Sequence, residues 1–293
     1  MQIKQYYRLH IECAIVLFVG SIKNVNFTLQ PSSVKIAHMQ YKALFLDVDG
    51  TVIPYDYDAL PSDTVANAIQ KAQTHCTICL VTGRGLGFVR PILNKLKIHT
   101  GYVVLNTGAV IVDLSTNTVV RETLLEKSEI TQVMRILKNE NINFYLKTDI
   151  DGMVHKQGYH DPDTSFEKTY MLMTSEEHPE STIDNVLSQF SPFSSINAFK
   201  TVHKDSTKFG INITHINATK LHGVQFILER MNLKRDEVIG VGDSYNDFPL
   251  LMASGFKVAM GNAIEDLKAI ADYVAPDVTE DGVADVIEKF ILK

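Results

Sequence analysis

From residue 42 onward, short apolar runs alternate with amphipathic stretches, and few folds accommodate this alternation. The runs KALFLDV (42–48) and TICLVTG (77–83) are apolar over most of their length, which is typical of strands covered by helices on both faces. Ser62 is placed to cap a helix between them. The alternation returns near the C-terminus with EVIGVG (237–242). The sequence therefore predicts the α/β fold class, with a doubly wound parallel sheet.

The pattern differs in the middle of the chain. GYVVLNTGAVIV (101–112) is predicted to form a single third strand, but from about residue 120 the strand-like runs become alternating, and a helix precedes and follows them. Strands that pair in hairpins with helices on one side indicate an α+β insertion into the core domain. The expected division is an N-terminal extension, a core domain of two segments and an α+β domain inserted between them: 1–38; 39–119 with 206–293; and 120–205.

Charge and cysteine content narrow the class of protein. The 293 residues include 28 Lys and Arg against 34 Asp and Glu, a net charge of −6, which argues against a nucleic-acid partner. The three cysteines, Cys13, Cys76 and Cys79, are too few and too unevenly spaced for a disulfide framework, so a reducing, cytoplasmic location is expected. The apolar run at 13–22 has half the roughly 20 residues of a membrane-spanning helix. No membrane association is expected.

The first 38 residues leave three interpretations open. Lys4 and Arg8 before a short apolar run suggest a signal peptide, but Glu12 interrupts the approach and no small-x-small cleavage site follows. A disordered or loosely packed extension fits the sequence better. So does a start of translation at Met39, directly before the first predicted strand. We expect one of the latter two.

Acidic side chains follow two of the predicted strands. Asp47 and Asp49 stand at the end of the first strand, and Asp243 follows the strand that ends at Gly242. Ligands of parallel sheets bind beyond the carboxyl ends of the strands. Like charges gathered there require a counter-charge, and a divalent cation with oxygen ligands, such as Mg²⁺, supplies one. The alternative is that each aspartate only caps a turn or a helix.

Two further positions indicate an anionic ligand. In LVTGR (80–84) the Thr82 hydroxyl and the Gly83 amide can donate hydrogen bonds to a phosphate near a helix N-terminus. Lys220 lies in the first turn of a predicted helix, where the helix dipole disfavours a cation, so a negative group is expected nearby. The alternatives are an ordinary strand-to-helix turn and an exposed lysine.

These motifs occur in an order that resembles the haloacid dehalogenase (HAD) superfamily of phosphotransferases. They are DVDGT (47–51), VTGR (81–84), Lys220 before a helix, and GDSYND (242–247). The stretch KVAMGNAIEDLKAIADYVAPDVTEDGVADVIEKF (257–290) is similar to the C-terminal signature of the Cof-type branch. The resemblance covers residues 41–293, and the inserted segment resembles the α+β cap of this branch.

The resemblance implies roles for individual residues. Asp47 would be the nucleophile that forms an aspartyl-phosphate, and Asp49 the general acid and then the general base. Mg²⁺ would be held by Asp47, the backbone carbonyl of Asp49 and the carboxylate of Asp243, with Asp247 in support. The residues implied to hold the phosphoryl oxygens are Thr82, Gly83, Lys220 and Asn246, with Asn262 as a further candidate. The chain reads NTGA at 106–109 where the family often has NGA, so Asn106 receives no substrate role.

The function implied is a Mg²⁺-dependent phosphatase, a phosphoric monoester hydrolase acting on a small phosphorylated metabolite. A phosphomutase resembling the phosphomannomutases is one alternative, and a non-catalytic sugar-phosphate binding module is another. A mutase must hold a second phosphate in the cap, a task suited to arginine. Arg135 is the only arginine between residues 122 and 205, which disfavours the mutase. The sequence indicates no oligomeric state.

Overall fold

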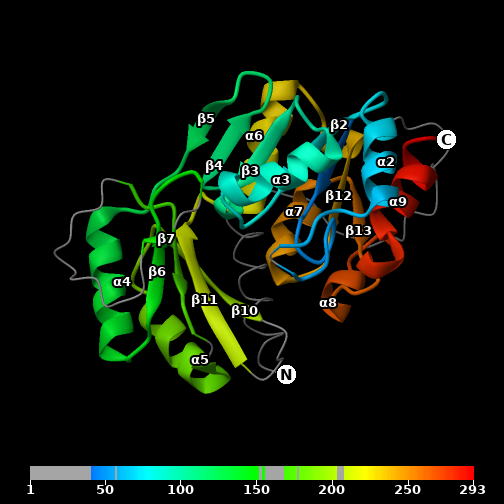
Figure 1. Ribbon diagram of the computed structural model, residues 1–293. Coiled ribbons are helices and arrows are strands. Elements are labelled where there is room, and N and C mark those ends of the chain that lie inside the picture. Colours follow the sequence, from blue (N-terminus) through cyan, green and yellow to red (C-terminus); the bar gives the residue numbers. More distant parts are fainter. Residues whose placement is uncertain (1–40, 57, 152–153, 156–167, 177, 203–207) are drawn as a thin grey trace, which may run out of the picture. The chain divides into compact units, whose positions relative to one another are not determined.

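The computed structural model describes residues 41–56, 58–151, 154–155, 168–176, 178–202 and 208–293. The interpretations of residues 1–38 lie outside this part of the chain. The described residues belong to one compact unit. They form two sheets, each with its own hydrophobic core (Figure 1). None of the described helices is both long and apolar enough to cross a bilayer.

The larger sheet has eight strands in the order β14-β13-β12-β1-β2-β3-β4-β5. From β14 to β3 every neighbouring pair is parallel. β4 and β5 extend the sheet in antiparallel pairing. The strands are β1 (Ala43–Leu46), β2 (Thr77–Val81), β3 (Tyr102–Leu105), β4 (Val110–Asp113), β5 (Thr118–Glu122), β12 (Val238–Gly242), β13 (Phe256–Ala259) and β14 (Tyr273–Val274).

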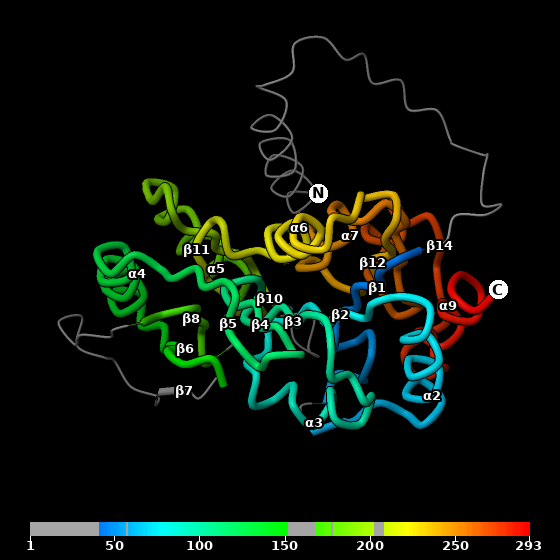
Figure 2. Tube along the Cα trace, turned by 90° about the horizontal axis from the view of Figure 1, so that it is seen from above, coloured from blue at the N-terminus to red at the C-terminus, as the bar shows by residue number. Residues whose placement is uncertain are grey.

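Helices cover both faces of this sheet, which confirms the doubly wound α/β prediction. Figure 2 shows α6 and α7 on one side of β1, β2 and β12, and α2 and α3 on the other. The Ser62 hydroxyl accepts a hydrogen bond from the Val65 amide at 3.1 Å and caps α2, as predicted. The helices are α2 (Asp63–Ala72), α3 (Leu86–Leu96), α6 (Lys220–Met231), α7 (Phe248–Ala253), α8 (Glu265–Lys268) and α9 (Gly282–Phe290).

The prediction of one strand over 101–112 is wrong, because this run folds back on itself. β3 ends at Leu105, residues 106–108 form a 3₁₀ turn, and β4 returns antiparallel with Val110 opposite Leu105. The turn is made by left-handed backbone, with φ of 48° at Asn106, 63° at Thr107 and 120° at Gly108. Both strands are buried, so the reversal is hidden in a continuous apolar run.

The smaller sheet is antiparallel, in the order β10-β11-β8-β6-β7, with β9 also paired to β11. Helices α4 and α5 pack on it through a separate core that includes Val133, Leu146 and Ile183. This is the α+β arrangement expected for the middle of the chain. The elements are α4 (Lys127–Asn139), α5 (Glu180–Gln189), β6 (Phe144–Lys147), β7 (Val154–His155), β8 (Met171–Thr174), β9 (His178–Pro179), β10 (Ile196–Val202) and β11 (Lys208–His215).

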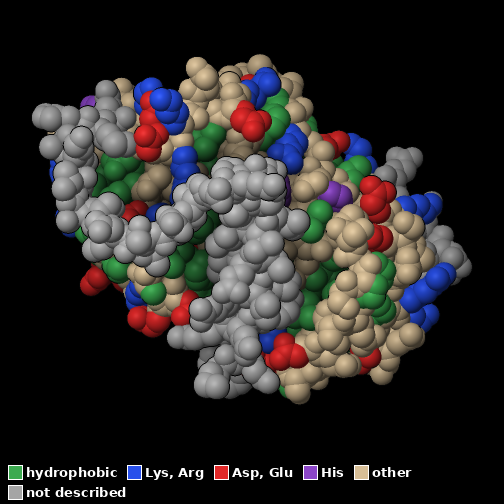
Figure 3. All heavy atoms as spheres, turned by 180° about the vertical axis from the view of Figure 1, so that it is seen from behind, with side chains coloured by type: hydrophobic (Ala, Val, Ile, Leu, Met, Phe, Trp, Pro, Cys, Tyr) green, Lys and Arg blue, Asp and Glu red, His purple; other side chains and the backbone are tan. Residues whose placement is uncertain are grey.

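Charged side chains of both signs are interspersed on the described surface seen in Figure 3. The two cysteines of the described chain, Cys76 and Cys79, are free thiols buried beside and within β2. Burial raises the pKa of each thiol to about 12. Neither is therefore a reactive thiolate at neutral pH.

Candidate active site

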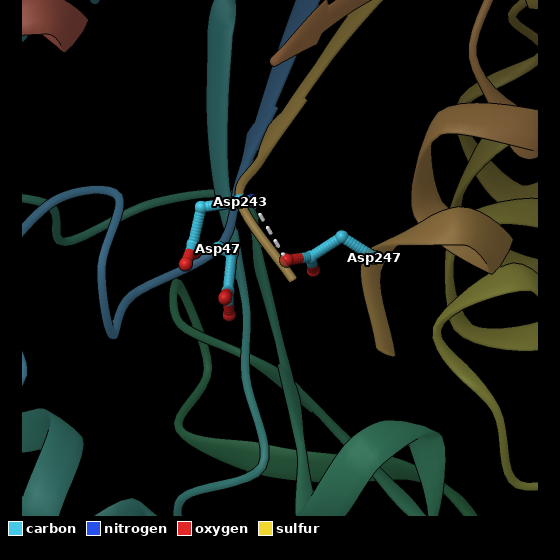
Figure 4. A group of neighbouring side chains, drawn as sticks. All are labelled: Asp47, Asp243 and Asp247. Atoms are coloured by element: carbon cyan, nitrogen blue, oxygen red, sulfur yellow. Dashed lines mark hydrogen bonds between the residues drawn. The ribbon is translucent and has the colours of Figure 1, made fainter. Parts of the chain in front are cut away.

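Parallel pairing of β1 with β12 brings the first and last acidic motifs together. Leu46 lies opposite Val241, and the Asp47 amide donates to the Val241 carbonyl at 3.0 Å. Asp47 directly follows Leu46, Asp243 stands two residues after Val241, and both are buried. Together with Asp247 they offer carboxylate oxygens that all lie within 4.8 Å of one another (Figure 4). Residues almost 200 positions apart in the sequence thus share one rim of the sheet.

Lys220 is the cation of this cluster. It begins α6, is fully buried, and its Nζ lies 2.6 Å from Oδ1 of Asp47 and 2.6 Å from Oδ1 of Asp247. Burial disfavours the ammonium, but the charges of Asp247 and Asp47 outweigh it and raise the Lys220 pKa above its ordinary value. The negative group expected near this helix N-terminus is therefore present, as two carboxylates of the protein itself.

Asp247 holds the loop that follows β12. Its Oδ2 accepts hydrogen bonds from the amides of Asp243 and Ser244, each at 3.0 Å, while its Oδ1 accepts from Lys220. Both oxygens are thus used to fix the positions of Asp243 and Lys220. This geometry fits the supporting role that the resemblance implies for Asp247.

Asp243 is held from the opposite side by the turn after β1. The Thr51 hydroxyl donates to its Oδ1 at 3.0 Å, and the Tyr55 hydroxyl donates to its Oδ2. The turn passes so close that a Cβ on Gly50, whose φ is 78°, would lie 2.4 Å from Oδ2 of Asp243. Burial, reinforced by the charge of Asp247, raises the pKa of Asp243 to about 7. Burial and Asp247 also raise the pKa of Asp47.

The donor set fits a divalent cation. Three carboxylates and one ammonium leave a formal charge of −2 in a buried cluster, and carboxylate oxygens are the ligands that hard cations prefer. The carboxylate of Asp49 is not part of this group. The contribution expected from Asp49 is its backbone carbonyl.

The Asp49 side chain is instead paired with Arg84. The guanidinium approaches both carboxylate oxygens, with Nε at 3.1 and 3.0 Å and Nη2 at 2.6 Å. Arg84 is buried, whereas the Asp49 side chain is 31% exposed. Arg84 stands in the VTGR motif, but sequence reasoning gave roles only to Thr82 and Gly83. Its partner is 35 residues away in the chain and could not be read from the motif.

The residues expected to hold phosphate present groups that described residues leave unused. The buried Thr82 hydroxyl accepts from the Arg84 amide at 3.1 Å and donates to no described residue. The Gly83 amide makes no hydrogen bond within the described chain. Oδ1 of Asn246 is buried without a partner there, but an amide oxygen only accepts, so Asn246 would have to hold a phosphoryl oxygen through its Nδ2. The Asn262 side chain, in contrast, donates to the Gly50 carbonyl at 2.8 Å and accepts from the Val278 amide at 2.9 Å.

The first amides of α3 are already occupied. The Leu86 amide donates to the Ile150 carbonyl at 2.7 Å, and the Gly87 amide donates to the Asp151 carbonyl at 3.2 Å. These acceptors belong to the turn after β6 of the smaller sheet. A phosphate near this helix would therefore rely on amides that precede it, such as those of Gly83 and Gly85, which make no hydrogen bond to described residues.

Sequence reasoning missed two buried polar side chains near these groups. Lys147, at the end of β6, donates from Nζ to the Gly83 carbonyl at 2.8 Å. Asn106 has no described partner for either polar atom of its side chain, and its amide donates to the Arg84 carbonyl at 3.0 Å. A lysine that closes an otherwise apolar strand was the available signal for Lys147. For Asn106 the available signal was the NTGA run at 106–109, which was given no role because the family often has NGA there.

Comparison with known proteins agrees with this architecture. Residues 44–287 match the family of haloacid dehalogenase-like hydrolases. The 5-amino-6-(5-phospho-D-ribitylamino)uracil phosphatase YcsE of Bacillus subtilis is 26% identical over 261 residues, which are 89% of this chain and 100% of that protein.

Two solved structures share the fold at low sequence identity. The phosphatase BT1666 from Bacteroides thetaiotaomicron gives a TM-score of 0.72 at 22% identity, over 89% of this chain and 99% of that one. The HAD subclass IIB sugar phosphatase BT4131 gives a TM-score of 0.69 at 20% identity, over 85% of this chain and 98% of that one. These likenesses and the family match confirm the resemblance read from the motifs: the chain belongs to the haloacid dehalogenase-like hydrolase family.

Proposed function

We propose that this hydrolase is a Mg²⁺-dependent phosphatase that releases phosphate from a small phosphorylated metabolite. The observation that carries the proposal is the buried cluster of Asp47, Asp243, Asp247 and Lys220 at one rim of the parallel sheet. Relatives named as phosphatases support the reaction class, and one of them is named for a phosphoribitylamino substrate. Phosphoryl transfer depends mainly on positioning and charge neutralisation, which such a cluster supplies.

In the proposed reaction, a carboxylate oxygen of Asp47 attacks phosphorus, and the bond from phosphorus to the leaving oxygen breaks. Asp49 gives a proton to the leaving oxygen, and then takes one from the water that hydrolyses the aspartyl-phosphate. Lys220 holds the carboxylate of Asp47 in place. Mg²⁺ held by Asp47, Asp243 and the backbone carbonyl of Asp49 would neutralise charge on the phosphoryl group.

Thr82, Gly83, Lys220 and Asn246 are proposed to receive the phosphoryl oxygens. The unused Gly83 amide and the proton of the Thr82 hydroxyl are suitable donors. Arg84 holds the ionised carboxylate of Asp49 through two nitrogens, which suits the step in which Asp49 takes a proton from water; to give a proton to the leaving oxygen, Asp49 must first leave this contact. The smaller sheet with α4 and α5 is proposed to act as a cap that covers the substrate. The predicted bounds of 120–205 are too early at both ends, because β5 extends to Glu122 in the larger sheet and β11 (Lys208–His215) belongs to the smaller one. The buried, unpaired thiols of Cys76 and Cys79 support a reducing, cytoplasmic location.

The two alternatives have less support. Arg135 lies exposed on α4, and residues 122–205 contain no other arginine, so a second phosphate site of the mutase kind lacks its natural ligand. A binding module without activity would not need the nucleophile, acid and metal cluster together. Supplying a hexose 1-phosphate with Mg²⁺ separates the three functions, since the products are free phosphate, the 6-phosphate isomer or neither.

The decisive variant is Asp47→Asn. It removes the attacking charge with little change in shape, so we expect phosphate release from p-nitrophenyl phosphate to fall by at least about 1,000-fold. Lys138→Met, which alters an exposed lysine of α4, is the control and should keep wild-type activity. Circular dichroism checks that both variants are folded. Activity retained in a folded Asp47→Asn protein contradicts the proposed nucleophile.

A further inference from the structure

Lys147 is a buried cation that the proposed reaction does not use. It ends β6 of the smaller sheet, where its backbone pairs with Met171 and Val154. Its side chain is only 6% exposed, and its Nζ donates to the Gly83 carbonyl at 2.8 Å. Gly83 lies in the turn after β2 of the larger sheet, so Lys147 reaches from one sheet to a turn of the other that is proposed to bind phosphate.

The position of Lys147 is fixed by the chain that follows it. Three residues later, the Ile150 carbonyl accepts from the first amide of α3, and the Asp151 carbonyl accepts from the next. The backbone of Lys147 is thereby anchored on both sides, by the ladder of β6 and by this turn, and its ammonium is held by the Gly83 carbonyl. A cation held in this way has lost its freedom before any ligand arrives, which favours binding of a ligand that it contacts.

No described carboxylate forms an ion pair with Lys147, whose hydrogen bond within the described chain is the one to Gly83. Lys220, also buried, contacts two carboxylates, and Lys200 of β10 contacts Glu180 and Asp184. Burial lowers the pKa of Lys147 to about 8, with Asp49 opposing the shift and Arg84 adding to it. The ammonium remains the main form at neutral pH, and a buried charge of this kind calls for a negative partner.

A chain of contacts links Lys147 to the proposed acid. Its Nζ donates to the carbonyl of Gly83, the residue before Arg84, and two nitrogens of Arg84 bind the carboxylate of Asp49. Asp49 and Arg84 are also the charged groups that shift the pKa of Lys147. Lys147 therefore lies on the side of the site where Asp49 would protonate the leaving oxygen, which is the side of the leaving part of the substrate.

Building on the phosphatase function proposed above, we propose that Lys147 is a specificity-determining residue that binds an anionic group on the leaving part of the substrate. The substrate class is then a phosphate monoester that carries a carboxylate or a second phosphate close to the ester oxygen. An ammonium recognises either anion as a point charge, so the shared chemistry is a negative group within a few bonds of the ester.

The test compares two esters of similar size, phosphoglycolate and ethylene glycol monophosphate, which differ in having a carboxylate or a neutral hydroxymethyl group. The wild-type enzyme should have the higher kcat/KM for phosphoglycolate. Lys147→Met should lower kcat/KM for phosphoglycolate at least about tenfold, because a desolvated charge pair is lost, and should change it less than about threefold for the neutral ester. Lys147→Arg, which keeps the charge, should retain the preference. A phosphomonoester with a second phosphate in place of the carboxylate shows which anion is preferred.

Lys138→Met removes an exposed lysine from α4 and serves as the control for net charge; it should leave both esters unaffected. Equal losses for the two esters in Lys147→Met would mean that Lys147 supports cap docking or the phosphoryl group, and would overturn the inference. An unchanged variant, or a wild-type enzyme without preference, would overturn it too. If Lys147→Met does not fold, Lys147→Gln is measured in the same way. Failure of the wild type to hydrolyse any phosphomonoester would instead remove the phosphatase function itself.

Discussion

At the scale of single residues, the raised pKa of Asp243 connects metal binding to pH. In the folded protein the pKa of Asp243 is raised to about 7, while an aspartate of the unfolded chain has a pKa near 3.9. The folded state thus binds more protons in this interval, and the metal-free protein should lose stability as the pH rises from about 4 to about 7. A metal ligand must also be deprotonated.

We therefore expect the affinity for Mg²⁺ to rise about tenfold per pH unit below pH 7 and to level off above it. Isothermal titration calorimetry between pH 5.5 and 8.5 measures this directly. Asp243→Asn should bind Mg²⁺ more weakly and with a smaller dependence on pH in the same range, the remainder coming from Asp47, whose pKa is also raised. An affinity that is equal at pH 6 and pH 8 in the wild type would contradict the assignment of Asp243 as a ligand.

Short motifs predicted many residues of the candidate site, but not which of its residues contact one another. Asp47, Asp243 and Lys220 were identified because each stands at a strand end or a helix start, where the topology fixes its place. The pairing of Arg84 with Asp49 joins residues 35 positions apart, and the hydrogen bond from Lys147 to Gly83 joins residues 64 positions apart. No local pattern in one sequence records such contacts.

At the scale of elements, the β3–β4 hairpin shows where the hydrophobic pattern of the sequence does not reveal a chain reversal. An apolar run that is buried on both sides has the same pattern whether it continues or reverses. The reversal depends on three successive residues with positive φ. The hairpin also supports the site, because a Cβ on Gly108 would lie 2.2 Å from the carbonyl oxygen of Thr219, the N-cap of the helix that begins at Lys220.

Gly108→Ala should accordingly reduce both stability and activity. Its φ of 120° and the clash with Thr219 lead us to expect a loss of about 2–3 kcal/mol in the free energy of unfolding. Urea denaturation measures it, and kcat should fall as Lys220 is displaced. Asn117→Ala is the matched control, since Asn117 also has a positive φ, of 54°, but lies in an exposed turn. A loss no larger than that of the control would show that the close approach to Thr219 does not matter.

At the scale of the whole molecule, the two separate cores predict two separable units of stability. Leu146 is fully buried in the core of the smaller sheet, and Leu80 in that of the larger sheet. Leu146→Ala should cost about 2–5 kcal/mol locally. Amide hydrogen exchange should then accelerate in β6, β8 and β11 but not in β1 and β12.

Leu80→Ala is the reciprocal variant and should accelerate exchange in β1 and β12. Uniform acceleration over both sheets in either variant would mean that the chain unfolds as one unit.

The α/β class and the α+β insertion were predictable because βα alternation and hairpin alternation leave different periods in the sequence. The contacts of Lys147 and of the turn after β6 with the larger sheet were not predictable, because they consist of a few long-range hydrogen bonds.

The turn after β6 joins α3 through main-chain carbonyls. Such an attachment does not depend on the side chain at the exposed position 151, since every amino acid carries the same backbone carbonyl. Over evolutionary time the side chains of this turn can therefore change, while the main-chain hydrogen bonds that hold it, and with it Lys147, beside Gly83 stay the same. The side chains of these few residues are thus free to change with the substrate, while their backbone carbonyls keep the turn attached to α3.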